Sequence, residues 1–156
     1  MATFQEIAKE LSVEHDLLYQ NRINCSQVLR EFRKALVEVL KTGCDLYPAD
    51  WDGKLGGAMT PFGALQIQED GWLKANMYFD DGLHWIVLPF EINTDGKSFK
   101  VRISSYNFEV GEVEISELLK KKALELSDHL VKQIRDSQDR IRNGESSKRI
   151  GFVREK

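Results

Sequence analysis

The sequence is poor in cysteine, proline and histidine: its 156 residues include two, three and three of these, respectively. Two cysteines, Cys25 and Cys44, cannot form the dense disulfide framework of a small secreted protein. Neither cysteine stands near a histidine at the spacing of a four-ligand zinc site. We therefore expect reduced thiols, no metal site and no cofactor.

Long apolar runs are also missing. No stretch approaches the length that crosses a bilayer, and the N-terminus lacks the basic-then-apolar pattern of an export signal. The sequence therefore predicts a cytoplasmic protein that does not enter a membrane. Its 25 acidic and 22 basic residues give a formal net charge of −3, which argues against a surface that attracts nucleic acid everywhere. Apolar residues make up 42% of the chain, which is enough to bury a core.

The N-terminal part has two helical patterns. Thr3 and Glu6 have the spacing of a capping box at a helix start, and apolar residues then repeat at the helical period. A second helix is predicted to begin after Asn24 or Ser26, both good N-caps, and to end at Gly43. Its apolar stripe consists of Val28, Leu29, Phe32, Ala35, Leu36, Val39 and Leu40.

The central part has the pattern of a β-sheet. From Phe62 the apolar residues alternate with period two, and Asp-Gly pairs at 70–71, 81–82 and 95–96 separate the runs. Asp-Gly between alternating runs is a strong hairpin signal, so we predict an antiparallel meander of four to six strands. The preceding residues 45–61 are rich in glycine and proline, have no period and are predicted to form a connecting loop.

The turns also predict a register. Two-residue turns at the second and third Asp-Gly pairs place Tyr78 opposite Trp85 and Glu91 opposite Lys100. At the first pair, a three-residue loop with Gly71 in the left-handed conformation fits the pattern better. Both registers assign to one face of the sheet the residues Leu73, Ala75, Met77, Phe79, Ile86, Leu88, Phe90, Ile92, Phe99, Val101 and Ile103.

A long helix is predicted at the end of the chain. Ser116 can cap it, and Asn143-Gly144 can stop it near residue 142. At 1.5 Å per residue it is about 40 Å long, so we expect its distal end to project or to meet a partner. Its apolar stripe consists of Leu119, Ala123, Leu126, Leu130 and Ile134, extended toward Ile141.

The apolar helical stripes can cover the apolar side of the meander. We therefore predict the α+β class, with N-terminal helices, an antiparallel meander of four to six strands, a long C-terminal helix, and the helices packed on one face of the sheet. Residues 1–144 form a single domain in this prediction, and residues 145–156 form a mobile basic tail.

The face of the sheet turned away from the helices should be polar, yet it carries aromatic and aliphatic side chains among the polar ones. Aromatic residues and arginine are enriched at the centres of protein interfaces, and contiguous exposed apolar patches are rare in monomers. A competing interpretation is that the N-terminal segment or the 45–61 loop folds over this face and makes a second core. The predicted partner-binding residues are Trp72, Lys74, Asn76, Tyr78, Trp85, Val87, Lys100 and Arg102.

Catalytic groups are not evident. His15 and His129 lie on polar helical stretches and are expected to be solvated, and His84 is expected at the rim of the inner face, opposite Phe79. No serine has a G-x-S-x-G context, and no cysteine has a histidine partner by spacing. Gly96-Lys97-Ser98 opens a strand rather than a helix, so it is read as a hairpin turn and not as a phosphate loop. We assign no catalytic residue.

Three classes of function fit these patterns. The leading hypothesis is a non-enzymatic interaction module of the inhibitor, immunity, adaptor or chaperone type, which binds a protein partner, or itself as a homodimer, through the outer face of its sheet. The alternative is a nucleic-acid-binding protein that stacks bases on the sheet aromatics and uses Lys74, Lys100, Arg102 and the basic tail for phosphates. The third is a small-ligand pocket or enzyme site between the sheet and the helices.

Overall fold

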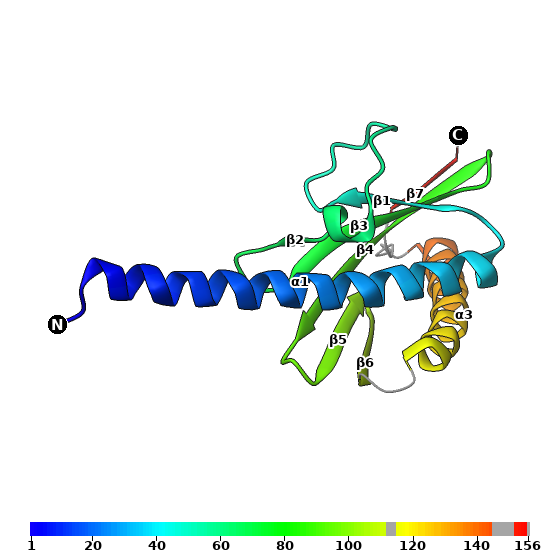
Figure 1. Ribbon diagram of the computed structural model, residues 1–156. Coiled ribbons are helices and arrows are strands. Elements are labelled where there is room, and N and C mark those ends of the chain that lie inside the picture. Colours follow the sequence, from blue (N-terminus) through cyan, green and yellow to red (C-terminus); the bar gives the residue numbers. More distant parts are fainter. Residues whose placement is uncertain (112–114, 145–151, 156) are drawn as a thin grey trace.

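The computed structural model describes residues 1–111 and 115–144 and the backbone of residues 152–155. The described elements form one seven-stranded antiparallel sheet with the main path β1-β3-β4-β5-β6, and Figure 1 shows α1 and α3 on the same side of it. The α+β class, with helices covering one sheet face, is therefore confirmed. In chain order the elements are α1 (Phe4–Leu40), β1 (Cys44–Pro48), α2 (Pro61–Ala64), β2 (Gln66–Ile67), β3 (Leu73–Asp80), β4 (His84–Thr94), β5 (Ser98–Ile103), β6 (Tyr106–Gly111), α3 (Ile115–Arg142) and β7 (Phe152–Glu155).

The N-terminal region is one continuous helix, so the prediction of a second helix that begins after Asn24 or Ser26 is wrong. The capping box is present: Thr3 Oγ1 accepts a hydrogen bond from Glu6 N, and Glu6 Oε2 accepts one from Thr3 N, both at 3.2 Å. Neither predicted second cap acts as one, because Ser26 Oγ donates to Ile23 O and Asn24 Oδ1 accepts from Gln20 Nε2, both within the helix. No glycine or proline stands between residues 4 and 42 to break the helix.

The hairpin registers differ from the prediction by two residues. Tyr78 pairs with Val87 rather than Trp85, and Glu91 pairs with Arg102 rather than Lys100. Residues at the turns explain the shift. At the second and third Asp-Gly pairs, Oδ1 of Asp81 and Oδ1 of Asp95 each accept hydrogen bonds from the backbone N–H groups two and three residues further on, at 2.6–2.9 Å, which makes these two loops longer than two-residue turns.

A shift of two residues leaves every side chain on its predicted face, because side chains alternate with period two. The first hairpin is as predicted: Ile67 pairs with Leu73, and Gly71 has φ +81° at the end of its loop. The assignment of faces is therefore correct although the two later turns are not.

Part of the predicted 45–61 loop is an edge strand. β1 pairs with residues 75–79 of β3, while β2 pairs with residues 73 and 74 on the same edge. The guanidinium of Arg33 holds β1 to α1, since its Nε donates to Cys44 O at 2.7 Å. On the other side of the β3-β4 pair, β7 pairs with residues 84–87 of β4, and β5 pairs with residues 90–94 of the same strand. The rest of the predicted tail lies outside the described residues.

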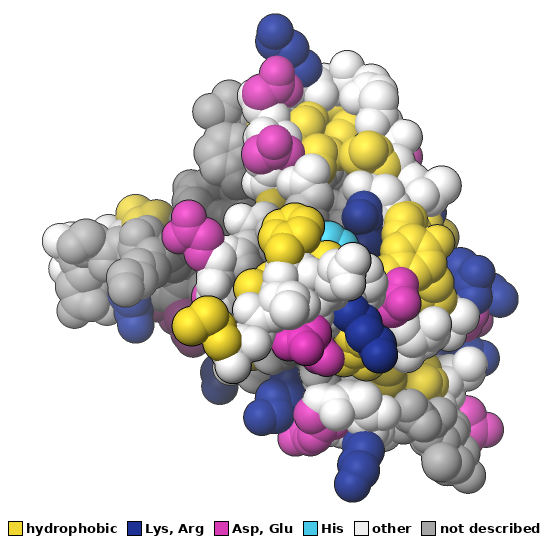
Figure 2. Space-filling view, turned by 60° about the vertical axis from the view of Figure 1, so that its left-hand side comes forward, with side chains coloured by type: hydrophobic (Ala, Val, Ile, Leu, Met, Phe, Trp, Pro, Cys, Tyr) yellow, Lys and Arg dark blue, Asp and Glu magenta, His cyan; other side chains and the backbone are white. Residues whose placement is uncertain are grey.

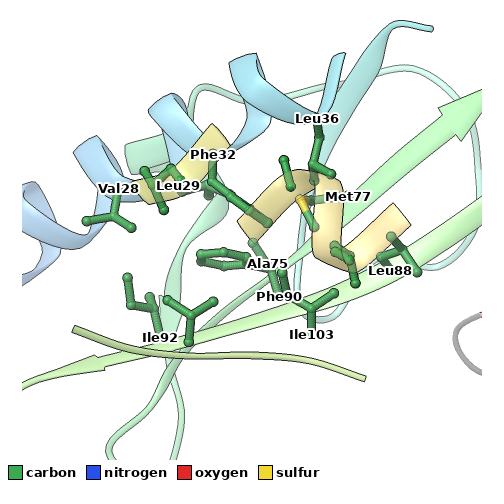
Figure 3. Close-up of a cluster of buried hydrophobic side chains, with 14 of the residues drawn as sticks. Val28, Leu29, Phe32, Leu36, Ala75, Met77, Leu88, Phe90, Ile92 and Ile103 are labelled. Carbon is green, nitrogen blue, oxygen red and sulfur yellow. The ribbon is translucent and has the colours of Figure 1, made fainter. Parts of the chain in front are cut away.

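The main core lies between the helices and the inner face of the sheet. All the residues predicted for this face belong to it, with Ile86 only partly buried. Figure 3 shows that α1 directs Val28, Leu29, Phe32 and Leu36 toward Ala75, Met77, Leu88 and Phe90 of the sheet. α3 adds Leu119, Ala123, Leu126 and Leu130, whereas Ile134 and Ile141 of its predicted stripe are 43% and 56% exposed.

Candidate functional site

The outer face of the sheet carries a second, smaller core. Tyr47, Tyr78 and Val87 are buried, with 2%, 6% and 8% of their surface exposed, and Trp51 and Trp85 pack against them. The Trp51 ring stacks on Tyr47 with centroids 4.2 Å apart and meets Tyr78 edge-on at 5.6 Å. The 45–61 segment therefore covers part of this face, as the competing interpretation proposed.

Hydrogen bonds to backbone carbonyl groups hold this covering segment in place. Trp51 Nε1 donates to Lys54 O at 2.7 Å, and Met59 N donates to Leu46 O at 2.9 Å. From the sheet, Asn76 Nδ2 donates to Pro48 O at 3.0 Å. The segment is thus tied to β1 and β3, and its indole has a defined position.

A cleft remains between this segment and the strands β3 and β4. Its volume is about 570 Å³, which lies in the range of ligand sites. Its walls are two half-buried indoles, and its floor carries an amide, a valine and an exposed proline. Trp51, Asp52, Gly53, Asn76, Trp85, Val87 and Pro89 line it.

Next to the cleft, the outer face carries a row of side chains with alternating charge, which we call the charge ladder: Asp70, Lys74, Glu91 and Arg102, the last stacked on Trp72. Lys74 Nζ lies 3.1 Å from Asp70 Oδ2 and 3.1 Å from Glu91 Oε1, and the Arg102 guanidinium lies 3.6 Å above the Trp72 ring. Glu91 Oε2 is 2.8 Å from Arg102 Nε, although the N–H does not point at it. Hydrogen bonds to Glu91 and Asp70 raise the pKa of Lys74.

The structure divides the predicted binding residues among four environments. Asn76, Trp85 and Val87 line the cleft, and Tyr78 is buried beneath it with its hydroxyl 2.6 Å from Asp80 Oδ2. Trp72, Lys74 and Arg102 form the charge ladder. Lys100 is exposed on β5, where it pairs with Asn93. These residues do not form one continuous site.

Sequence reasoning missed the residues that the covering segment brings to the cleft. Trp51, Asp52 and Gly53 lie in a stretch with no hydrophobic period, so no pattern assigns them to a face of the sheet. The available signal was the tryptophan itself, because a large aromatic side chain in a glycine-rich segment usually needs a surface to pack on.

The described residues contain no group of three or more histidine, cysteine, aspartate or glutamate side chains placed to hold a metal ion. Both cysteines are free and buried, and burial raises the pKa of each thiol to about 12. His84 does not face Phe79, which pairs with Ile86; it is exposed, with Nδ1 3.9 Å from Asp81 Oδ2. His129 is hydrogen-bonded rather than simply solvated, with Nε2 3.0 Å from Ser105 Oγ.

A second hollow lies between the helices and the sheet, where the ligand-pocket hypothesis expects one. It has a volume of about 370 Å³. Its described lining includes the exposed Arg30 and the half-buried Glu31, whose Nε and Oε1 lie 3.9 Å apart. His84, the histidine considered for such a site, does not line it.

In the part of the chain that the structure describes, no helix has the length and apolar character needed to span a membrane. Comparison with protein-family models, with curated proteins and with solved structures found no match.

Proposed function

We propose that the protein is a non-enzymatic interaction module that binds an extended segment of a partner protein in the cleft between Trp51 and Trp85. The cleft itself carries the proposal: it is concave, it opens on the outer face, and its two indoles are held by the second core. Rigid aromatic side chains on a supported surface are typical binding hot spots.

The lining of the cleft favours one kind of segment. Aromatic grooves bind extended, proline-containing peptides, because such peptides lose little conformational entropy and pack flat on indole rings. Asp52 is an exposed carboxylate in the lining, so it favours a lysine or arginine in the bound segment. The expected partner is therefore an extended peptide with proline or aliphatic residues beside a basic one.

The charge ladder argues against the nucleic-acid alternative. Lys74 lies between two carboxylates, and Arg102 is engaged by Glu91 and Trp72. A base stacked on Trp72 would have to displace the Arg102 guanidinium. Among the predicted phosphate-binding residues whose side chains are described, Lys100 remains as the exposed cation.

A displayed library of random peptides, selected on the wild-type protein, tests the proposal. We expect the selected peptides to be rich in proline and to contain lysine or arginine. Trp85→Ser should weaken their binding by about tenfold or more, which is a typical effect at a hot spot. Trp72→Ser, which removes the other outer-face indole, should change their binding by less than about twofold.

Because Trp85 also touches the second core, a second variant separates binding from folding. Asp52→Asn alters an exposed loop residue and should weaken only the peptides that carry a basic residue. Peptides that bind Trp85→Ser and wild type equally well, or a selection that enriches no sequence, would contradict the proposal.

A further inference from the structure

The first half of α1 extends beyond the rest of the molecule. Figure 1 shows its N-terminal turns running clear of the sheet. The helix meets the domain where the Tyr19 ring contacts Phe62 at 5.6 Å and where Arg22 Nε and Nη2 donate to Phe62 O at 2.9 and 2.7 Å. About 15 residues precede this anchor, which is about 22 Å of helix.

This projecting half carries an exposed apolar stripe. Phe4, Ile7, Leu11 and Leu18 are 82%, 49%, 48% and 40% exposed. At the helical period they continue the same side of α1 that farther along buries Cys25, Leu29, Phe32 and Leu36. Figure 2, turned toward this end of the molecule, shows hydrophobic side chains at the surface among charged ones. A stripe of this kind needs another helix to cover it.

Charge selects the kind of helix that fits. Residues 4–18 contain four carboxylates and one lysine, and Glu10 and Glu14 lie along one edge of the stripe. Pairing this half with the same half of a second copy in antiparallel orientation brings the two acidic edges together, which is unfavourable. The stripe therefore fits a helix with basic edges.

The last turns of α3 have these properties. After Leu130, which is buried, Val131, Ile134 and Ile141 are 45%, 43% and 56% exposed. Residues 131–142 contain four basic and two acidic side chains. On a helical projection Arg135 and Arg142 flank one edge of the apolar stripe and Arg140 flanks the other, whereas both aspartates lie on the back, from which Asp139 Oδ1 accepts a hydrogen bond from Arg142 Nη1 at 3.0 Å.

The two complementary halves cannot meet within one chain. In Figure 1 α3 packs beside the C-terminal half of α1, at the end of the molecule opposite to the projecting turns. Contact between them therefore requires two copies.

We propose that the projecting half of α1 packs on the exposed end of α3 of a second copy, and that two such contacts, related by a two-fold axis, form a dimer. Reciprocal exchange gives a closed assembly and doubles the small area that one pair of short helices buries. This contact is separate from the cleft between Trp51 and Trp85.

Sedimentation equilibrium of the full chain tests this contact, with Leu11→Ser and Val13→Ser as a matched pair. Both residues are 48% exposed on the same helix, but Val13 lies off the stripe. We expect a dimer for wild type, a dissociation constant raised by more than about tenfold in Leu11→Ser, and little change in Val13→Ser.

Charge reversal identifies the second helix. The double variant E10K/E14K and the double variant R135E/R142E should each raise the dissociation constant by about three- to tenfold, and mixing the two should restore much of the loss. Added salt should weaken the wild-type dimer.

Three results would overturn the proposal: a monomer at every concentration, equal effects of Leu11→Ser and Val13→Ser, or a dimer that is indifferent to charge reversal on α3. The last result would indicate pairing through α1 alone. Trp85→Ser should leave the dimer intact, so failure of the peptide-binding proposal is distinguishable from failure of this one.

Discussion

At the scale of single residues, the two thiols illustrate how burial controls reactivity. Cys25 and Cys44 are 0% and 4% exposed, and burial raises the pKa of each to about 12. An ordinary cysteine has a pKa near 8.5. At a pH of about 8 only about one molecule in ten thousand carries either thiolate, and the thiolate is the reactive form.

We therefore predict that a disulfide reagent such as dithionitrobenzoate modifies the folded protein at less than about a hundredth of the rate for the unfolded chain. Absorbance of the released thionitrobenzoate measures both rates, with guanidinium used to unfold the chain. Rapid modification of either cysteine in the folded protein would contradict the burial described for it.

Single residues also explain why the registers of the two later hairpins could not be predicted from the sequence. The Asp-Gly pattern predicts a hairpin, but it does not say whether the aspartate side chain will bind the backbone of the loop. Asp81 and Asp95 do so, and each widens its turn by two residues. The faces of the sheet were predictable because hydrophobic alternation is independent of turn length, whereas the cross-strand partners were not.

At the scale of secondary-structure elements, α1 consists of two halves that contribute differently to the free energy of unfolding. Its second half packs Phe32, with no exposed surface, against Phe108 with ring centroids 5.4 Å apart. Its first half makes no comparable packing contact among the described residues within one chain. The projecting turns remain helical because the packed half supplies the nucleus from which a helix propagates.

We predict that Phe32→Ala lowers the free energy of unfolding by about 3 to 5 kcal/mol, because it leaves a cavity in the main core. Leu11→Ala should change it by less than about 0.5 kcal/mol in the monomer. Urea denaturation, at a concentration where light scattering gives the monomer mass, measures both. Equal losses would mean that the projecting half packs against its own domain.

β1 is, with α2 and β7, one of the elements that the sequence did not reveal. In residues 44–48 only Asp45 is exposed and Pro48 is partly exposed, and the segment gives too short an alternation to recognise as a strand. Their pairing depends on β3, which is distant in sequence. Because β1 places Tyr47 under Trp51, missing this strand left the second core as a competing interpretation and meant missing one wall of the cleft.

At the scale of the whole molecule, ionisable groups shape the dependence of stability on pH. The pKa values of Asp70, Asp81 and Asp95 are lowered mainly by backbone hydrogen bonds, and that of Glu125 by the Tyr106 hydroxyl. The stability that these groups contribute is present above their unfolded pKa values, near 4, and is lost as pH falls through the lower folded values.

The opposite limb comes from four groups whose pKa values are raised by burial: the thiols of Cys25 and Cys44, each to about 12, and the hydroxyls of Tyr78, also to about 12, and Tyr106. Their contribution is full below the unfolded values, about 8.5 for the thiols and about 10 for the tyrosines, and is lost as pH rises toward the folded ones.

We therefore predict that the urea midpoint is highest between about pH 5 and pH 8 and falls on both sides. Asp95→Asn keeps an oxygen that can accept the turn hydrogen bonds but cannot titrate, so it should reduce the drop on the acid side. Urea titrations at several pH values measure both effects. A midpoint that rises on acidification would contradict the assigned pKa directions.

The fold class and the residues of the main core could be predicted at this scale, because both follow from hydrophobic periodicity. The candidate site could be predicted only in part. The outer face was identified as the informative surface, but the division of its residues between a second core, a cleft and a charge ladder depends on the packing of Trp51 and on the pairing of Glu91. The binding roles of the residues named for this face stay predictions.

The anchor at Arg22 determines how the molecule presents its two ends. Two hydrogen bonds to one carbonyl, together with the guanidinium 4.2 Å above the Phe62 ring, fix the angle at which α1 leaves the domain. The projecting turns therefore form a rigid extension of the domain. A partner bound at the N-terminal end of α1 is kept at a set distance and orientation from the rest of the protein.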